Sequence, residues 1–464
     1  MSIRSSYTFD PAWLVRASGG NWLHMPTMPI KRVCHDTRML LPGDLYVAIR
    51  GARVDGHTLL GEAFEKGAAA ALVEEAYAQQ CSGLPNKPLL VVPDTLVALG
   101  RLASMHRHRL GAWITGITGS VGKTTVKDMT AALLGQRGKT VCTKGNWNNH
   151  IGLPLSMLAM ERDTQFGVFE LGMNHPGEIL PLSELLRPDW AVVTAIGPVH
   201  LEHFDHVEAI ANEKADLLRV LPRDGVAFLY KGDPYFPLLK EAAPCAVRTL
   251  GLEGDGDADM HVAGRRGELL VYERGSETPQ DMPLPGPGKH HLVNAGLAIM
   301  VARAAGCSWE QIRKGFFEYR PPPMRWQIQS YGSLTVVNDA YNANPISMKA
   351  ALETFDQMLS KGNKWLVLGD MLELGDYAAE AHRDLGALVA RGEWAGMVAV
   401  GLHAQTVWDA ALEGGVEPGK GAAFHTVQEA GAWLKPRLAR GDAILLKGSR
   451  GVQLEDLLQY FEAG

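Results

Sequence analysis

The chain contains few cysteines and has no excess of basic residues. Its five cysteines among 464 residues are widely spaced and form no C-x-x-C pair, so neither a disulfide framework nor a zinc site is indicated. The formal net charge is -6, and a general nucleic-acid-binding protein needs basic surface instead. We therefore expect reduced, buried thiols in a cytoplasmic protein that binds no nucleic acid.

Long apolar runs are also missing. The N-terminus lacks the apolar core of a signal peptide, and the longest apolar stretch, residues 292–301, is too short to span a bilayer and contains Asn294. Hydrophobic residues make up 46% of the chain and charged residues 21%, which is typical of a globular enzyme. The length predicts about three domains, and we expect none of them to insert into a membrane.

The pattern of apolar runs divides the chain into three blocks. Residues 1–110 mix short strand-like and helix-like runs, and residues 111–320 alternate strands and helices, which predicts a parallel sheet with right-handed crossovers. Three consecutive prolines at 321–323 mark the next boundary, because they cannot lie inside a helix or a central strand. Residues 321–464 alternate again, as in a small dinucleotide-binding domain. No G-x-G-x-x-G follows the first strand of this block, so a nicotinamide cofactor is not expected.

The most informative motif is a glycine-rich loop between an apolar strand and a helix. It consists of Thr118, Gly119, Ser120, Val121, Gly122, Lys123, Thr124 and Thr125. Strand, loop, Lys-Thr and helix in this order predict a cradle for the phosphates of a nucleoside triphosphate. The helix N-terminus adds partial positive charge, Lys123 a mobile cation, and Thr124 or Thr125 a hydroxyl for Mg²⁺. The strict pattern has glycine where this chain has Ile117, and the alternative is an ordinary glycine-rich turn.

Polar residues follow two further strands of the predicted parallel sheet. Glu170 ends the apolar run 166–169, and His200 follows the run 190–196. Because parallel strands end at one edge of a sheet, both side chains should lie near the phosphate loop and could bind Mg²⁺. Taken alone, His200 is better explained as a helix cap or a buried histidine. Lys214, which has acidic neighbours in a helix-like segment, is better explained as a solvated surface lysine.

Three polar loops follow strands of the C-terminal block. Residues 338–345 offer a carboxylate, three amides and a phenol, a density that suits recognition of a base, a ribose or a polar substrate. A single Asn-Pro would indicate only a turn. The second loop is 369–375, with His382 beyond it. The third places Lys447 and Arg450 around Gly-Ser, which predicts a carboxylate- or phosphate-binding loop or, equally, a plain basic turn.

Together these motifs resemble the Mur ligase family, ATP-dependent amide-forming enzymes of peptidoglycan precursor synthesis. The matching residues occur in the order of the family pattern along nearly the whole chain. They are the phosphate loop, Glu170, residues 197–200, Lys214, Asn294 and Arg325. Residues 144–154, 341–345, 369–375 and 447–450 resemble the member of the family that adds a dipeptide. Residues 35–38, 42–44 and 55–57 resemble the family's UDP-sugar-binding domain.

The resemblance implies an α/β protein of three domains. A small mixed α/β domain over 1–110 would bind the UDP substrate, and a central P-loop domain with a parallel sheet over 111–320 would bind ATP. A Rossmann-like domain over 321–464 would bind the incoming dipeptide and part of ATP. The implied cofactors are ATP and Mg²⁺, and the implied substrates are UDP-N-acetylmuramoyl-tripeptide and D-alanyl-D-alanine, joined through an acyl-phosphate. We further expect a monomer whose domains close about hinges near residues 110 and 321–323.

The same resemblance implies a role for each candidate residue. The catalytic residues would be Lys123, Lys214 and His200. The Mg²⁺ ligands would be Thr124, Glu170, His200 and Lys214, the last as a carbamate. ATP would contact the phosphate loop from Thr118 to Thr125 and also Asn294, Arg325, Asp339 and Asn342. The UDP-tripeptide would contact Thr37, Arg38, Asn148 and Asn149. The dipeptide would contact Asn344, Glu373, Lys447, Ser449 and Arg450.

Three positions depart from the family pattern. Thr37 stands where serine is usual, Met324 where glycine is usual, and Asp216 where glutamate is common. The loop that contains Met324 could therefore differ in shape. The alternatives are a sister Mur ligase or folylpolyglutamate synthase, the latter disfavoured by the separate N-terminal block. From another class, a nucleotide-dependent switch that ligates nothing is also possible.

Overall fold

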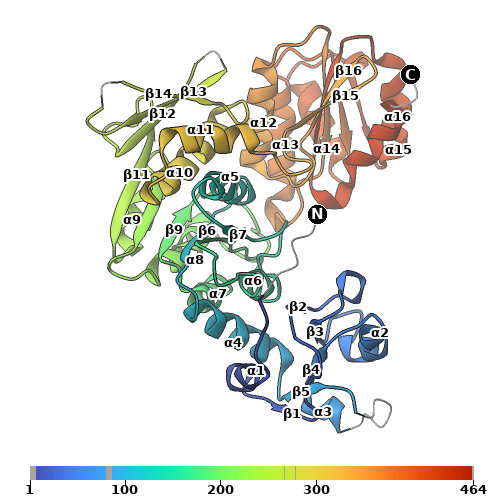
Figure 1. Cartoon of the computed structure of the whole chain (residues 1–464). Helices are drawn as coiled ribbons and strands as arrows, with labels where there is room; N and C mark the ends of the chain where they lie inside the picture. The colour runs from blue at the N-terminus through green and yellow to red at the C-terminus, as the bar shows by residue number, and fades with distance from the viewer. Residues whose placement is uncertain (1–6, 80–85, 266, 277, 462–464) are drawn as a thin grey trace.

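The computed structural model describes residues 7–79, 86–265, 267–276 and 278–461. Within these ranges the chain forms three lobes, built on sheets of five, nine and six strands (Figure 1). The predicted α/β class with three domains is confirmed. The domain limits at 110 and 320 remain predictions.

The N-terminal lobe, blue in Figure 1, has a mixed sheet in the order β1-β5-β4-β3-β2. Its strands are β1 (Asn21–Trp22), β2 (Arg32–Cys34), β3 (Asp44–Val47), β4 (Ala70–Glu74) and β5 (Leu89–Val92), and its helices are α1 (Pro11–Ser18), α2 (Leu60–Glu65) and α3 (Glu75–Ala78). Strand β1 is antiparallel to β5, whereas β2 to β5 are parallel. After Asp44 the residues of β3 are apolar because both faces are covered: Leu45 and Val47 belong to one core cluster and Tyr46 to another.

The central lobe has the strand order β14-β13-β12-β11-β10-β9-β6-β8-β7. The strands are β6 (Trp113–Thr118), β7 (Thr140–Cys142), β8 (Phe166–Glu170), β9 (Trp190–Val193), β10 (Val226–Tyr230), β11 (Ala246–Leu252), β12 (Met260–Arg265), β13 (Glu268–Glu273) and β14 (Gln280–Pro283). Pairing is parallel from β7 to β12, and β13 and β14 add an antiparallel extension. The strand–helix alternation predicted up to residue 320 is therefore wrong for residues 246–283. These strands are partly exposed and carry charged residues, so they lack the apolar runs of the parallel core.

Helices cover both faces of the central sheet. They are α5 (Lys123–Gly135), α6 (Gly152–Met157), α7 (Ile179–Leu186), α8 (Val207–Arg219), α9 (Phe236–Ala242), α10 (Lys289–Ala304) and α11 (Trp309–Glu318). Residues of α5, α10 and α11 share one core cluster, and residues of α6 to α9 belong to the other. This three-layer arrangement leaves the carboxyl ends of β6, β8 and β9 free for a ligand.

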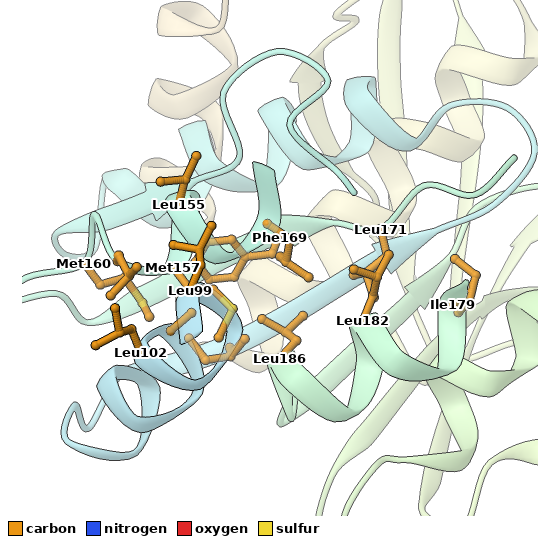
Figure 2. Close-up of a cluster of buried hydrophobic side chains, with 14 of the residues drawn as sticks. Leu99, Leu102, Leu155, Met157, Met160, Phe169, Leu171, Ile179, Leu182 and Leu186 are labelled. Carbon is orange, nitrogen blue, oxygen red and sulfur yellow. The ribbon is translucent and has the colours of Figure 1, made fainter. Parts of the chain in front are cut away.

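Helix α4 (Thr95–His108) joins the N-terminal and central lobes. Figure 2 shows Leu99 and Leu102 of α4 among apolar side chains of α6, α7 and β8. At the end of the helix, the guanidinium of Arg107 pairs with the Asp189 carboxylate at 2.9 Å. The hinge predicted near residue 110 would thus follow directly after a helix that is packed into the central lobe.

The C-terminal lobe, orange to red in Figure 1, has the strand order β15-β16-β20-β17-β18-β19. Its elements are β15 (Gln327–Tyr331), β16 (Leu334–Asn338), α12 (Pro345–Gln357), β17 (Lys364–Gly369), α13 (Ala378–Val389), β18 (Gly396–Val400), α14 (Ala404–Glu413), β19 (Gly421–Phe424), α15 (Val427–Leu434), β20 (Ala443–Lys447) and α16 (Leu458–Phe461). The predicted strands at 334–337, 364–368, 397–400 and 443–447 are confirmed as β16, β17, β18 and β20. The sequence did not reveal β15 or β19.

The cysteine side chains are less buried than the sequence predicted. Cys34 and Cys307 are buried, but Cys142 and Cys245 are only half-buried, so the expectation of buried thiols is wrong for these two; all four are free. Cys81 lies outside the described residues.

Among the helices in the described ranges, none is long and apolar enough to cross a membrane.

Candidate active site

The glycine-rich loop lies between β6 and α5, which confirms the predicted order of strand, loop and helix. Gly119 has φ 145° and Gly122 has φ 88°, both in the left-handed region that favours glycine. A Cβ on Gly119 would lie 2.0 Å from Oγ1 of Thr194, and one on Gly122 would lie 2.5 Å from Oδ1 of Asn294. The loop therefore needs glycine at both positions, and Asn294 directly contacts it.

Several side chains of the loop are bound to the protein itself. The Thr118 hydroxyl donates to the carbonyl of Leu171 at 3.0 Å. The Ser120 hydroxyl donates to the carbonyl of Gly197 at 3.0 Å. The Lys123 ammonium donates to two carbonyls of its own loop, those of Gly119 at 2.7 Å and Ser120 at 3.2 Å. Burial lowers the pKa of Lys123, and the nearby Glu170 carboxylate opposes this shift.

Glu170 lies beside the loop, as predicted. It ends β8, where it pairs in register with Ile117 of β6. Its two carboxylate oxygens accept hydrogen bonds from Thr124 Oγ1 at 2.9 Å and from Asn148 Nδ2 at 2.8 Å. The Thr124 hydroxyl in turn accepts a hydrogen bond from the guanidinium of Arg325 at 3.1 Å. Residues from four distant segments thus meet at the start of α5.

Lys214 is buried on α8, with 1% of its surface exposed, so the interpretation as a solvated surface lysine is wrong. Helical spacing explains the burial, because Ile210, Ala211, Leu217 and Leu218 form the buried face of α8 and Lys214 lies among them. Burial lowers the pKa of Lys214 well below its usual range, and repulsion from the Lys123 ammonium adds to this effect. Burial therefore favours the neutral amine over the ammonium more strongly here than at an exposed lysine.

His200 also lies at this edge of the sheet, in the left-handed region with φ 54°. Its Nδ1 is 2.7 Å from Oε2 of Glu373, which belongs to the C-terminal lobe. The bond with His200 lowers the pKa of Glu373. His200 caps no helix, since α8 is capped by His206. The helix-cap interpretation of His200 is therefore wrong.

A cavity of about 1500 Å³ lies between the central and C-terminal lobes. The predicted site residues that line it are Ser120, Val121, Gly122, Lys123, Thr124, Thr125, Asn148, Asn149, Glu170, His200, Asn294, Arg325, Asp339, Asn342, Asn344, Glu373 and Lys447. Thr118, Gly119, Lys214, Ser449 and Arg450 are not part of the lining. A cavity of this size has room for a nucleotide together with a second ligand.

Comparison with known proteins agrees with this geometry. Residues 29–107 match the family model "Mur ligase family, catalytic domain", residues 117–302 "Mur ligase middle domain", and residues 324–450 "Mur ligase, glutamate ligase domain". A Bacillus subtilis protein named UDP-N-acetylmuramoyl-tripeptide–D-alanyl-D-alanine ligase is 37% identical over 436 residues, which cover 93% of each chain. The chain belongs to the Mur ligase family.

Solved structures of Mur ligases support the same conclusion. A crystal structure of MurF from Acinetobacter baumannii has a TM-score of 0.87 at 30% identity and covers 99% of both chains. The MurF ligase of Thermotoga maritima, solved in complex with ADP, has a TM-score of 0.77 at 25% identity and covers 93% of this chain and 97% of that one. The resemblance inferred from the motifs is confirmed.

In this Mur ligase, the side chains of the C-terminal loops mostly bind the protein itself. Lys447 is buried and pairs with Oδ2 of Asp339 at 2.7 Å, while it also donates to the carbonyl of Asn342 at 3.1 Å. Asn344 caps α12 by accepting from the amide of Ser347 at 2.9 Å. These contacts hold the loop 338–345 in place against β20.

Arg325 projects from a backbone turn with unusual geometry. Its neighbours Met324 and Trp326 have φ 60° and φ 51°, a conformation that glycine adopts without strain. The guanidinium lies 4.2 Å from the ring centroid of Tyr341, within cation–π range. The left-handed backbone at Met324 gives a physical reason for the glycine that the family usually has there.

The residues predicted to bind the UDP substrate lie apart from the cavity, except for the two asparagines. In the N-terminal lobe, Thr37 is buried, and Arg38 pairs with its neighbour Asp36 while its side chain stays 85% exposed. Asn149 uses its side-chain oxygen to accept from the amide of Gly152 at 3.0 Å, at the start of α6. The N-terminal and central lobes meet where the rings of His35 and Trp147 are 5.8 Å apart.

Two cavity-lining histidines were missed by the sequence reasoning. Burial lowers the pKa of His290 to about 4 and that of His291 to about 3, so both imidazoles are neutral at pH 7. They lie in the first turn of α10, which begins at Lys289 after the glycine- and proline-rich segment 284–288, and they precede Asn294 by about one turn. Two consecutive histidines at the start of a largely apolar helix, just after a turn-forming segment, were the sequence feature that could have indicated them.

The donor atoms beside the phosphate loop suit Mg²⁺, which prefers oxygen ligands. Thr124 offers a hydroxyl and Glu170 a carboxylate, and the two are in direct contact. In the described part of the chain no three His, Cys, Asp or Glu side chains gather closely enough to hold a metal ion. A magnesium site here would therefore need further oxygens, such as those of nucleotide phosphates.

Proposed function

We propose that this chain joins D-alanyl-D-alanine to the terminal carboxylate of UDP-N-acetylmuramoyl-tripeptide, with conversion of ATP to ADP and phosphate. The names of its curated relatives support this activity. The structural observation that carries the proposal is the contact of Thr124 with both Glu170 and Arg325, at the mouth of the phosphate loop and between two lobes. That contact brings a guanidinium and a carboxylate from separate lobes to one point.

The chemistry explains why cations are needed there. A carboxylate is a poor electrophile, so an oxygen of the tripeptide carboxylate first attacks the γ-phosphorus of ATP, and ADP leaves. The amine of the dipeptide then attacks the carbonyl carbon of the acyl-phosphate, loses a proton, and phosphate leaves with the former carboxylate oxygen. Lys123 and Arg325 would stabilise the negative charge of the transferring phosphoryl group.

Bound Mg²⁺ would neutralise further phosphate charge. Thr124 and Glu170 would hold one ion and His200 a second, and Lys214 would bind Mg²⁺ as a carbamate. The low pKa of buried Lys214 supports this modification, because only a neutral amine attacks CO₂. Starting from the ammonium form, the modification forms one N–C bond and releases two protons, one when the ammonium becomes the neutral amine and one when that amine attacks CO₂, so a cation becomes an anion. Repulsion between Lys214 and a metal cation would thereby become attraction.

We assign a substrate or nucleotide to each of the remaining candidate residues. ATP would contact the phosphate loop, Asn294, Arg325, Asp339 and Asn342. The UDP-tripeptide would extend from Thr37 and Arg38 to Asn148 and Asn149. The dipeptide would contact Asn344, Glu373, Lys447, Ser449 and Arg450. The Lys447 ammonium would do so while it stays paired with the Asp339 carboxylate. We propose that the enzyme works as a monomer in the cytoplasm.

A phosphate-release assay tests the function. Phosphate should appear only when ATP, Mg²⁺, UDP-tripeptide and D-alanyl-D-alanine are all present, in a 1:1 ratio with the ligated product. Lys123→Ala is the control for the phosphate loop. Equal release without the dipeptide would indicate a nucleotide-dependent switch. Release that depends on a single amino acid would indicate a sister ligase.

A further inference from the structure

The loop after β17 reaches from the C-terminal lobe to the central lobe. Its Glu373 pairs with His200 at 2.7 Å. At the end of the loop, a Cβ on Gly375 would lie 3.0 Å from Cα of Glu202, so the backbones of the two lobes nearly touch there. Glu373 and Gly375 have φ 64° and φ 54°. A left-handed backbone at a glutamate is costly, and it persists only where the surroundings hold it.

A buried histidine, His382 of α13, holds the start of this loop. The amide of Met371 donates to Nε2 of His382 at 3.0 Å. Nδ1 of the same ring lies 2.6 Å from the carbonyl of Ala378 and must donate to it, so Nε2 is left as the acceptor. The His382 side chain is 0% exposed, and burial lowers its pKa, which agrees with the neutral form that this bonding needs.

Ser449 holds the next residue of the loop. Its hydroxyl oxygen accepts from the amide of Leu372 at 3.0 Å, and its own amide donates to the carbonyl of Asp370 at 2.9 Å. The Asp370 carboxylate accepts from the amides of Leu402 at 2.6 Å and His403 at 3.0 Å. Both amides that directly precede Glu373 are thus bound by side chains from other segments of the lobe.

We propose that His382 is a positioning residue for ligation. By accepting the Met371 amide it holds the loop 371–375 in the shape that carries Glu373 onto His200, and this contact stabilises the closed arrangement of the two lobes. His382 lies behind the loop and not in the cavity lining, so its effect passes through Glu373. The inference rests on the proposed function, because ligation is the step that closure would serve.

The test compares His382→Leu with His382→Gln. Leucine fills the space without an acceptor, whereas the glutamine side-chain oxygen can accept from Met371. Two readouts are needed: kcat and KM for each substrate, and the distance between spin labels on the central and C-terminal lobes with a non-hydrolysable ATP analogue and UDP-tripeptide bound. We expect His382→Leu to lower kcat roughly tenfold and to broaden the distance towards the open form. KM for UDP-tripeptide should stay unchanged, and His382→Gln should restore most of both readouts.

Two further variants separate positioning from loss of stability. Leu434→Ala removes a buried side chain from the opposite core cluster of the same lobe, so it should lower the melting temperature without changing kcat or the label distance at 25 °C. Glu373→Gln changes a side chain that is 53% exposed, so it should fold normally and reproduce the open distance distribution.

The proposal is overturned if His382→Leu keeps the closed distance and the wild-type kcat. It is also overturned if Leu434→Ala and His382→Leu lose kcat in proportion to their melting temperatures while His382→Gln rescues nothing. Absence of dipeptide-dependent phosphate release in the wild type would refute the proposed function instead. The label distances would still report on the loop in that case.

Discussion

Replacing Gly197 by alanine should hinder closure of the C-terminal lobe on the central lobe. A Cβ on Gly197 would lie 1.8 Å from Cδ1 of Ile346 in α12, and all atoms within 4 Å belong to Ile346. The backbone of Gly197 cannot easily retreat, because its amide and carbonyl both bond Ser120 Oγ at 3.0 Å. The clash therefore falls on the contact between the two lobes, at the end of the Ile346 side chain, whose rotation decides how much of the overpacking cost remains.

The size of the effect follows from overpacking, which typically costs about 1–3 kcal/mol. If this cost applies to the closed form alone, the ratio of closed to open molecules falls roughly 5- to 150-fold, at 1.4 kcal/mol per factor of ten. The assay is kcat/KM for ligation, with the Kd for UDP-tripeptide as the reference. Ligation should fall within that range while UDP-tripeptide binding stays the same.

A compensating change makes this prediction specific. Ile346→Ala removes the clashing atom, so Gly197→Ala combined with Ile346→Ala should ligate better than Gly197→Ala alone. Wild-type ligation by Gly197→Ala would refute the reasoning. A double variant no better than the single one would refute it too, because the loss would then arise in the phosphate loop.

Three further predictions follow from the same structure. Lys214→Ala should lower kcat by about 10² to 10³, at any bicarbonate concentration, because no amine remains to carry a carbamate; wild-type-like turnover would remove the carbamate role. Gly122→Ala should weaken ATP binding roughly 5- to 30-fold, since the left-handed backbone costs about 1–2 kcal/mol and the new Cβ meets Asn294. Gly135→Ala, with open space at the other end of α5, should instead be neutral or stabilise the protein by about 0.5–1 kcal/mol in urea unfolding. His290 and His291 stay neutral in the folded protein and become protonated in the unfolded chain below about pH 6.5. As the pH is lowered from about 6 to about 5, the free energy of unfolding should therefore fall by about 1.4 kcal/mol per pH unit for each imidazole. Substitution of both histidines by asparagine should reduce this dependence on pH, and an unchanged dependence would contradict the prediction.

Local sequence features were sufficient for the phosphate loop and the sheet around it. The strands β6, β8, β9 and β10 are covered on both faces and so appear as apolar runs, and the loop between β6 and α5 carries its function in consecutive residues. The strands β11 to β14 could not be found in this way, because one side of each is partly exposed and charged residues interrupt the pattern.

The contacts between lobes could not be predicted from local patterns. Glu373 and His200 are far apart in the chain, and nothing in either segment indicates that a left-handed backbone turns them towards each other. Lys214 is a different case: its position on the apolar face of α8 was visible in the helical spacing, but the acidic neighbours suggested a solvated side. Helical position was the better guide.

Transfer of oxygen from the tripeptide to phosphate tests the central claim most directly. UDP-tripeptide labelled with ¹⁸O in its terminal carboxylate is incubated with the enzyme, ATP, Mg²⁺ and D-alanyl-D-alanine, and the phosphate is analysed by mass spectrometry. Activation of the carboxylate as an acyl-phosphate predicts one ¹⁸O atom in each phosphate released. Unlabelled phosphate formed alongside ligated product would contradict it.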